Sequence, residues 1–357
     1  MSVYIIAEAG VNHNGSVETA KKLVDAAARA GADAVKFQTF KAENIAGEKA
    51  PKAIYQKRAT GSKEKQLEML KTLELDEKSH EILIRRCSER KIQFLSSPFD
   101  IPSLDLLVKK LRLRRIKIAS GEITNAPLLL EAGKSGRPII LSTGMCTLPE
   151  IRTALGVLAF GYTKERGAPS RKAFLAAYES GAGRLALKKK VVLLQCTTEY
   201  PTPFEDANLL SMDTLKNTFL LPVGLSDHTT GITVPIAAAA RGAVIIEKHL
   251  TLDRLMPGPD HQASLEPDEF SAMVKAIHQV ESALGSPLKR PAKREIQNRA
   301  VARKSLVAAC DIRKGDIFTE SNLAVKRPGT GASPLLYWDC LGKKARRSYR
   351  KDEAIER

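Results

Sequence analysis

Short apolar runs alternate with amphipathic helical stretches eight times along the first 284 residues of this 357-residue chain. Most of the runs are apolar on both faces, which is typical of parallel strands buried between a core and a layer of helices. We expect these strands at residues 3–7, 34–38, 93–97, 115–119, 138–142, 191–196, 221–225 and 244–247. We expect the helices at residues 17–30, 77–91, 101–110, 127–134, 148–159, 211–219, 232–241 and 267–284. Eight such units predict an α/β fold, the (β/α)8 TIM barrel.

A doubly wound sheet is the main alternative for a chain in which strands and helices alternate. That fold places a glycine-rich fingerprint after its first strand, and Gly10 and Gly15 do not form one. Two connections are unusually long, residues 41–74 and 162–189, and connections of this length are usually functional or locally folded. The first one follows the carboxyl end of a strand, so we expect it on the catalytic face of the barrel.

The composition of the chain changes after Leu284. Residues 285–298 are rich in proline and basic side chains, and we interpret them as a linker. Residues 299–357 contain short apolar runs joined by glycine turns, which indicates a small β-rich domain. A domain of about 60 residues is marginally stable alone, so we expect it to pack on the barrel or on a partner subunit. The predicted catalytic barrel then comprises residues 1–284.

The chain has 57 Lys and Arg residues against 40 Asp and Glu residues, a formal net charge of +17. We expect no nucleic-acid partner, because no aromatic stacking ladder or nucleic-acid motif accompanies the basic residues. We expect no membrane contact either, because no apolar stretch approaches the roughly 20 residues of a membrane span. Glu8 also interrupts the first apolar run too early for a signal peptide. The five cysteines lack metal or redox spacing, which predicts reduced thiols in a cytoplasmic protein.

Two of the predicted strands lead into a histidine. His228 follows the seventh strand and His249 follows the eighth, and the carboxyl ends of barrel strands share one rim. Two imidazoles on that rim could bind one divalent metal ion, for which imidazole is a common ligand. The alternative is that both residues are polar caps of loops. The histidines alone do not separate these interpretations.

Two lysines lie inside apolar strands, Lys36 in Ala-Val-Lys-Phe-Gln and Lys117 in Arg-Ile-Lys-Ile-Ala. An ammonium group buried without a partner is costly, so each lysine must meet a carboxylate or a bound anion. One interpretation is an internal ion pair with Glu8, Glu122 or Glu247. Another is a clamp for a phosphate or carboxylate, completed by the hydroxyls of Ser97, Ser120 and Thr198. A Schiff-base lysine is a third, which a neighbouring pair of metal ligands makes less favourable.

Taken together, these residues resemble the sialic acid synthase family. The resemblance covers practically the whole chain in order, at residues 6–15, 35–39, 96–99, 117–122, 141–145, 196–203, 224–229, 247–261 and 326–331. The last of these motifs, Lys-Arg-Pro-Gly-Thr-Gly, looks like the antifreeze-like (SAF, β-clip) domain of that family. The resemblance therefore implies a barrel followed by a SAF domain at residues 299–357.

The resemblance also implies a reaction between phosphoenolpyruvate and an N-acetylated mannosamine. In that family, C3 of phosphoenolpyruvate attacks the open-chain aldehyde, water adds at C2, and phosphate leaves by C–O cleavage to give a nine-carbon sialic acid. A Mn²⁺ or Mg²⁺ ion polarises the aldehyde, and two protein ligands leave coordination positions for water and substrate oxygens. The sequence does not choose between the two metals.

The family roles carry over by motif onto residues of this chain. The resemblance implies His228 and His249 as metal ligands and Glu8 as the acid–base residue. The residues implied for phosphoenolpyruvate are Lys36, Ser97, Lys117, Ser120, Thr198 and Ser226. The residues implied for the sugar are Gln38, Phe99, Glu122, Tyr200 and Asp260. Arg327 is implied to reach the site of a partner subunit and to hold the N-acetyl group, which predicts a domain-swapped homodimer.

The motifs leave the acceptor sugar open. We expect N-acetylmannosamine, and the alternative is a 2,4-diacetamido-2,4,6-trideoxy-mannose, which would give a legionaminic-type product. A function of another class, non-catalytic binding of a sugar or of ice, is suggested by the antifreeze-like domain. The combination of Glu8, two histidines and two strand lysines argues against it, because binding alone has no use for that set.

Overall fold

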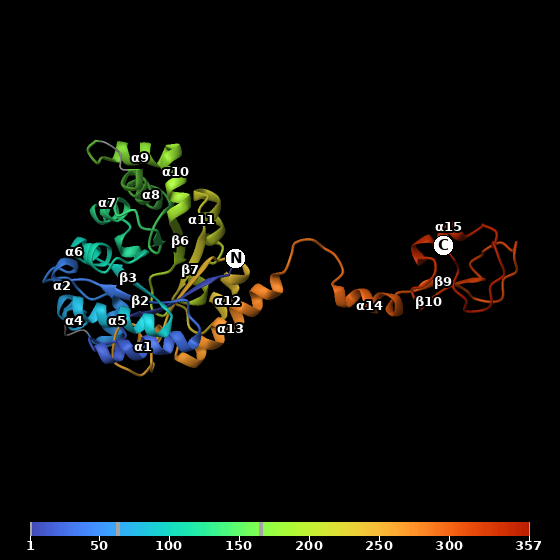
Figure 1. Ribbon diagram of the computed structural model, residues 1–357, viewed down its shortest axis with the longest axis horizontal. Helices are drawn as coiled ribbons and strands as arrows, with labels where there is room; N and C mark the ends of the chain where they lie inside the picture. Colours follow the sequence, from blue (N-terminus) through green and yellow to red (C-terminus); the bar gives the residue numbers. More distant parts are fainter. Residues whose placement is uncertain (1, 62–64, 164–166, 357) are drawn as a thin grey trace. The chain divides into compact units, whose positions relative to one another are not determined.

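The computed structural model of the chain (Figure 1) describes residues 2–61, 65–163 and 167–356. The chain divides into two compact units, Met1–Gly285 and Ser286–Arg357. None of the described helices combines the length and the apolarity that a membrane crossing requires.

The first unit is built on eight parallel strands. They are β1 (Tyr4–Gly10), β2 (Ala34–Thr39), β3 (Gln93–Pro98), β4 (Ile116–Ile118), β5 (Ile139–Ser142), β6 (Val191–Cys196), β7 (Val223–Asp227) and β8 (Ile245–His249). Their order in the sheet is β3-β2-β1-β8-β7-β6-β5-β4, and the two end strands, β3 and β4, lie next to each other. The sheet therefore forms a nearly closed barrel, which confirms the (β/α)8 prediction.

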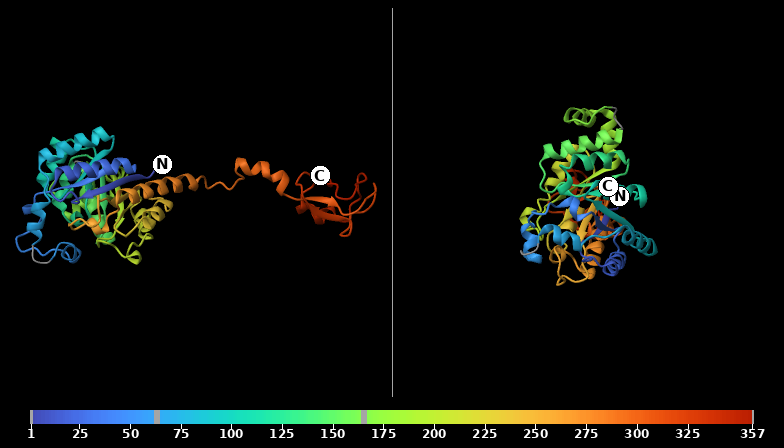
Figure 2. Two further views of the ribbon diagram at one scale, coloured as in Figure 1. Left: turned by 90° about the horizontal axis from the view of Figure 1, so that it is seen from below. Right: turned by 90° about the vertical axis from the view of Figure 1, so that its left-hand side faces the viewer.

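Helices cover the outside of these strands (Figures 1 and 2). They begin and end at local signals: Ser16 caps α1 by accepting a hydrogen bond from the Thr19 backbone, and Gly31 ends it with a φ of 87°. The helices at the expected positions are α1 (Val17–Ala30), α5 (Glu77–Arg90), α6 (Ile101–Asp105) with a π-helical extension (Leu106–Lys110), α7 (Ala126–Lys134), α8 (Leu148–Thr163), α11 (Ser211–Phe219), α12 (Thr233–Ala240) and α13 (Pro267–Leu284). Short 3₁₀ turns lie at Ser120–Glu122, Phe204–Asp206 and His261–Ala263.

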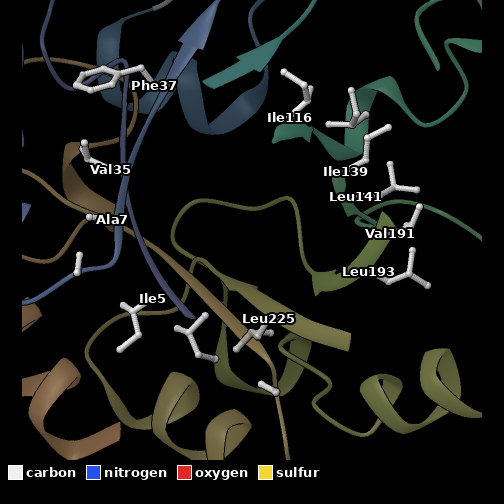
Figure 3. Packing of buried hydrophobic residues seen from close by; sticks show 14 of the residues in the cluster. Ile5, Ala7, Val35, Phe37, Ile116, Ile139, Leu141, Val191, Leu193 and Leu225 are labelled. Carbon is white, nitrogen blue, oxygen red and sulfur yellow. The ribbon is translucent and has the colours of Figure 1, made fainter. Parts of the chain in front are cut away.

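The core has two layers because successive strand residues point to opposite faces. The outward-facing side chains, among them Ile5, Val35 and Leu193, pack against the helices (Figure 3). The inward-facing side chains fill the interior of the barrel as a separate cluster of Ile6, Ala34, Leu95, Ile140, Leu194 and Ile245. This inner cluster closes the barrel below the carboxyl ends of the strands, so the space above it is left for polar side chains.

Three strands extend further than the apolar pattern indicates. The strands expected to end at residues 7, 225 and 247 end at Gly10, Asp227 and His249. The ladder aligns Glu8 with Lys36 on one side and with His249 on the other, so these polar residues continue the sheet. Hydrophobicity marks only the apolar part of a strand, whereas backbone pairing continues past it. The expected bounds were therefore too short by two or three residues at these carboxyl ends.

Both long connections are locally folded, which is one of the two expectations for connections of this length. The first contains α2 (Ala42–Ile45), α3 (Ile54–Thr60) and α4 (Gln66–Thr72), and the second contains α9 (Arg171–Glu179) and α10 (Gly181–Lys190). Residues 62–64 and 164–166 of these connections lie outside the described part of the chain. Helices α9 and α10 pack on α8 at the outer surface of the barrel.

The second unit is small and consists mostly of turns. Its elements are α14 (Lys293–Ala302), β9 (Ser305–Ala308), β10 (Leu323–Lys326), a 3₁₀ turn (Pro334–Leu336) and α15 (Tyr337–Cys340). Strands β9 and β10 form an antiparallel pair over a core that includes Leu306, Phe318 and Tyr349. The residues expected as a linker, 285–298, end inside helix α14, because α14 begins at Lys293.

Candidate active site

A cavity of about 360 Å³ lies at the carboxyl ends of the barrel strands. Every strand contributes to it either directly or through the loop that follows. The expected site residues that line the cavity are Glu8, Lys36, Gln38, Ser97, Phe99, Lys117, Ser120, Thr198, Tyr200, Ser226, His228, His249 and Asp260. The fold thus brings together side chains that are as far apart in the sequence as residues 8 and 260.

Four charged side chains form the floor of this cavity. Lys36 Nζ lies 2.5 Å from Glu8 Oε2 and 3.7 Å from Glu247 Oε2, and Lys117 Nζ lies 3.1 Å from Glu247 Oε1. All four side chains are at most 4% exposed. Both lysines therefore have internal carboxylate partners, as one interpretation of the sequence expected. We refer to Glu8, Lys36, Lys117 and Glu247 as the charged floor.

The period of two along a strand explains why these four groups meet. Glu8 lies two residues after Ile6 and Lys36 two residues after Ala34, so both point inward just above the apolar cluster of the barrel interior. Glu247 follows Ile245 in the same way. The inward faces of β1, β2 and β8 thus change from apolar to charged between one inward-facing residue and the next.

Burial and the nearby lysines give the two carboxyl groups of the charged floor, Glu8 and Glu247, different pKa values. Burial raises the pKa of Glu8 to about 7, and the attraction of Lys36 opposes that rise only in part. Burial also acts on Glu247, but Lys117 and Lys36 outweigh it and lower the pKa of Glu247 to about 2. Glu247 is therefore a fixed negative charge that holds the lysines, whereas Glu8 is able to exchange a proton near neutral pH.

The hydroxyl groups expected for an anion site lie around this floor. Lys36 Nζ donates to Ser97 Oγ at 3.2 Å, and Ser226 Oγ donates to Glu247 Oε1 at 2.8 Å. On the other side of the cavity, Ser120 Oγ and Thr198 Oγ1 lie 3.2 Å apart. Hydroxyls can reorient, so these groups are able to donate to a bound anion instead.

Gly10 allows a third cluster to form beside Glu8. It adopts a φ of +50°, and a Cβ at this position would lie 3.1 Å from Glu8 Oε1, 3.5 Å from Asp260 Oδ2 and 3.6 Å from Gln38 Nε2. A side chain on residue 10 would therefore crowd the space that Glu8, Gln38 and Asp260 share. Burial raises the pKa of Asp260 to about 6.

The two histidines from β7 and β8 lie at one edge of the cavity. Their ring centroids are 5.3 Å apart, and the Tyr200 ring lies 4.1 Å from that of His228 and 5.5 Å from that of His249. Burial lowers the pKa of His228 to about 4 and lowers the pKa of His249 well below its usual value. Both imidazoles are consequently neutral near pH 7 and keep a lone pair for a ligand.

These histidines fit a metal ion by three criteria. His228 Nδ1 donates to the Thr197 carbonyl at 2.6 Å, which leaves the lone pair on Nε2. His249 Nδ1 is buried without a hydrogen-bond partner in the described part of the chain. A metal bound at roughly 2.1 Å from a ring nitrogen lies about 3.2 Å from the ring centroid, so rings 5.3 Å apart are able to share one ion.

The chain itself supplies few further ligands. Among the described residues, no group of three or more His, Cys, Asp or Glu side chains is arranged to hold a metal ion. A metal bound by His228 and His249 would need water or substrate oxygens to complete its coordination, as the sequence analysis expects. The assignment of these residues as metal ligands stays a prediction.

Two expected site residues do not line the cavity. Glu122 accepts a hydrogen bond from Asn125 Nδ2 at 2.7 Å and is about half buried. Arg327 belongs to the second unit, where its Nε donates to the Ala302 carbonyl at 2.9 Å. The roles predicted for both residues stay predictions.

The other histidines of the barrel have local partners. His13 Nδ1 accepts from the Gly15 backbone at 3.0 Å, and His261 Nδ1 lies 2.7 Å from Thr251 Oγ1. His80 is buried against Thr39 Oγ1 at 2.7 Å, whereas His278 lies at the surface beside Glu281. These contacts fit turn, packing and surface roles.

One wall of the cavity comes from the long connection that we expected on the catalytic face, although none of its residues was predicted to belong to the site. The connection after β2 contributes seven lining residues, which are Phe40, Ile45, Gln56, Gln66, Met69, Leu70 and Leu73. Only the length of this connection indicated a role at the site. Glu247 was considered only as an ion-pair partner, although its position two residues before His249 on one strand already placed both on the same face.

Comparisons with known proteins identify the family of the chain. The model of the NeuB family matches residues 23–289, and the model of the SAF domain matches residues 303–356. The chain is 49% identical over 351 residues to the N,N'-diacetyllegionaminic acid synthase of Campylobacter jejuni, which covers 98% of each protein. It is 44% identical to the protein of the same name from Legionella pneumophila, over 96% of this chain and 90% of the relative.

A solved structure shows the same similarity in three dimensions. The N-acetylneuraminic acid (sialic acid) synthetase of Leptospira borgpetersenii, in complex with citrate, has a TM-score of 0.68 and 34% sequence identity. The match covers 84% of this chain and 90% of that one. The resemblance inferred from the motifs is confirmed. This chain belongs to the NeuB family of sialic acid-type synthases, and its carboxyl-terminal part is a SAF domain.

Proposed function

We propose that this protein condenses phosphoenolpyruvate with a 2,4-diacetamido-2,4,6-trideoxy-mannose to give N,N'-diacetyllegionaminic acid and phosphate. This choice rests on the 49% identity, over 98% of both proteins, to the N,N'-diacetyllegionaminic acid synthase of Campylobacter jejuni. The expected acceptor, N-acetylmannosamine, has weaker support, because the sialic acid synthetase of known structure is 34% identical. The alternative acceptor is therefore the one we favour.

The charged floor suits the phosphoenolpyruvate half of this reaction. A phosphate and a carboxylate on one small molecule require several cations in a water-excluded site, and Lys36 and Lys117 are both buried there. Glu247 keeps these two lysines in place before substrate arrives. The hydroxyls of Ser97, Ser120, Thr198 and Ser226 surround the lysines and supply the remaining donors.

Glu8 is the residue that we assign to proton transfer. Its pKa of about 7 leaves it partly protonated at neutral pH, which suits a group that must both accept and donate a proton. In the reaction, a new bond joins C3 of phosphoenolpyruvate to the aldehyde carbon of the sugar, and the aldehyde oxygen takes up a proton. Water adds at C2, and the bond from C2 to the phosphate oxygen breaks. We assign to Glu8 the deprotonation of that water or the protonation of that aldehyde oxygen.

His228 and His249 are the residues that would hold a divalent metal, Mn²⁺ or Mg²⁺. Such an ion supplies Lewis-acid polarisation of the sugar aldehyde. The chain's own contribution is to keep both imidazoles neutral by burial and to orient His228 through the Thr197 carbonyl.

The acceptor is tested by measuring phosphate release with phosphoenolpyruvate and a panel of sugars. The panel contains 2,4-diacetamido-2,4,6-trideoxy-mannose, N-acetylmannosamine and N-acetylmannosamine 6-phosphate. We expect kcat/KM to be at least about tenfold higher for the diacetamido sugar, because lost polar contacts to a second acetamido group are costly. Higher turnover of N-acetylmannosamine would contradict the proposal and restore the original expectation.

Chelation separates this enzyme from a protein that only binds sugars. Phosphate release should stop in EDTA and return when Mn²⁺ or Mg²⁺ is added. The His228→Ala variant should not regain activity, whereas replacement of the surface residue His278 by Ala should have no effect. If His228→Ala keeps wild-type phosphate release, the metal assignment is wrong.

We also propose that Arg327 acts in the site of a partner subunit within a homodimer. Mixing two inactive variants tests this. In a swapped dimer, a Glu8→Gln subunit donates an intact SAF domain to the intact barrel of an Arg327→Ala subunit, so refolded mixtures regain activity. If the mixtures stay inactive although mixed dimers are present, Arg327 does not act across subunits. A monomeric mass in solution scattering would contradict the dimer itself.

A further inference from the structure

One side of the cavity is apolar, in contrast to its charged floor. Val11, Phe40, Met69 and Leu73 form a hydrophobic cluster, and Ile45, Leu70 and Phe99 pack against it. All seven of these residues also line the cavity. We refer to them as the apolar rim. A whole hydrophobic cluster turned toward an active-site cavity suggests that it contacts an apolar part of a substrate.

The rim lies above one part of the barrel. Val11, Phe40 and Phe99 each come one residue after the ends of β1, β2 and β3. The remaining members come from α2 and α4 and the turn after α4, all in the long connection that follows β2. His228 instead directly follows the end of β7, and His249 is the last residue of β8. The rim and the histidines therefore lie over different strands of the barrel.

The lack of charged side chains in the rim limits which substrate groups it can bind. The lining side chains that the connection contributes between Phe40 and Leu73 include no ionisable group among the described residues. Two amides, Gln56 and Gln66, are the polar side chains there. A phosphate group placed against the seven side chains of the rim would lose its hydration without meeting a cation among them, which is strongly unfavourable. A methyl group placed there would instead gain from burial.

We infer that the apolar rim selects acceptors by their C6 end, favouring a 6-deoxy methyl group over a 6-hydroxyl and rejecting a 6-phosphate. This inference rests on the proposed function, because that reaction places C1 of the sugar over the charged floor. An open-chain sugar then directs C6 away from the floor. Leu70 and Ile45 are the specificity residues, because they line the cavity and remain partly exposed within the cluster.

Pairs of acceptors that differ only at C6 test the inference separately from the proposed function. One pair is 2,4-diacetamido-2,4,6-trideoxy-mannose and its 6-hydroxy counterpart, and the other is 2-acetamido-2,6-dideoxy-mannose and N-acetylmannosamine. In both pairs, we expect wild-type kcat/KM to favour the 6-deoxy sugar by about 10- to 100-fold, the range over which an apolar pocket distinguishes such groups. N-acetylmannosamine 6-phosphate should be the poorest acceptor.

Polar substitution of the rim should remove this preference. In Leu70→Asn and in Ile45→Asn, the 6-deoxy to 6-hydroxy ratio should fall by about tenfold, with KM for phosphoenolpyruvate unchanged. Leu70→Met should keep the ratio. Ile54→Asn is the matched control, because Ile54 belongs to the same connection but is 67% exposed and does not line the cavity. It should behave as wild type.

Each outcome decides one claim. If the wild type shows no preference within either pair, or if both Asn variants keep the wild-type ratio of 6-deoxy to 6-hydroxy activity, the rim does not select acceptors by the group at C6. If N-acetylmannosamine 6-phosphate is a good acceptor, the charge argument is wrong. Failure of the proposed function looks different: the diacetamido sugars would then be poorer than N-acetylmannosamine, whatever the C6 ratio.

Discussion

The charged floor and the apolar rim border the same cavity but are built in different ways. The floor is carried by barrel strands, and its four side chains hold one another through ion pairs of 2.5, 3.1 and 3.7 Å. The rim is carried by loops and short helices, and its members pack together as an apolar cluster. A mutation in the floor therefore disturbs charge and chemistry, whereas a mutation in the rim disturbs packing and the shape of the cavity.

The largest effect is expected from Glu8→Gln in the floor. The amide keeps the shape of the side chain but cannot exchange a proton, so kcat should fall by about 10³-fold. The measurement is phosphate release at saturating concentrations of both substrates. Glu18→Gln is the control, since Glu18 is exposed on α1. A kcat within about threefold of wild type would exclude proton transfer by Glu8.

The rim should instead respond in stability. Phe40 is buried within the rim and packs edge-on against Phe99, with ring centroids 6.2 Å apart. Phe40→Ala should lower the free energy of unfolding of the barrel by about 3 kcal/mol, because it leaves a cavity. Denaturant unfolding followed by circular dichroism measures this. The exposed Ile54→Ala should change stability by less than about 0.5 kcal/mol. Equal effects of the two variants would show that the rim is not a packed cluster.

Lys117→Met tests whether the charged floor, and not the rim, binds phosphoenolpyruvate. Loss of a buried cation should raise KM for phosphoenolpyruvate by about 30-fold, corresponding to one charged hydrogen bond. The selectivity among acceptors should not change, because the rim is intact. Steady-state kinetics with each substrate varied in turn measures both effects. An unchanged KM for phosphoenolpyruvate would remove Lys117 from the anion site.

The smallest effect concerns the pH dependence of stability. The pKa of Glu8 is about 7 in the folded protein, above its usual value of 4.5, so the folded state binds more protons than the unfolded state between these values. Stability supplied by protonated Glu8 is present below about pH 4.5 and is lost as the pH rises through 7. Glu8→Gln should make this decline shallower, which unfolding at several pH values measures.

Asp260 is a second buried carboxyl group with which the effect of Glu8 on the pH dependence of stability can be compared. Its raised pKa of about 6 has the same sign, so Asp260→Asn should remove a further part of the decline. The rim has no ionisable side chain among its seven members, so Phe40→Ala should leave the slope unchanged. If Glu8→Gln shows the wild-type slope, Glu8 does not carry the raised pKa.

The floor was far more predictable from the sequence than the rim. The sequence placed Lys36 and Lys117 within apolar strands and Glu8 at the end of another, and the eightfold repeat predicted that the carboxyl ends of these strands share one rim. The choice between internal ion pairs and an anion clamp could not be made, because it depends on distances between side chains as far apart in the sequence as Lys36 and Glu247. The structure shows the ion pairs with Glu8 and Glu247.

The rim could not be predicted because nothing periodic marks it. Ile45, Met69 and Leu70 are ordinary apolar residues of short helices, and only the folding of the connection back over β1, β2 and β3 turns them toward the cavity. The sequence by itself determined the barrel, the family and the residue types of the floor, because strand and helix periods are local and chemical motifs are short. Only the tertiary structure decided which charges pair and which apolar cluster faces the substrate, because both depend on contacts between segments that are distant in the chain.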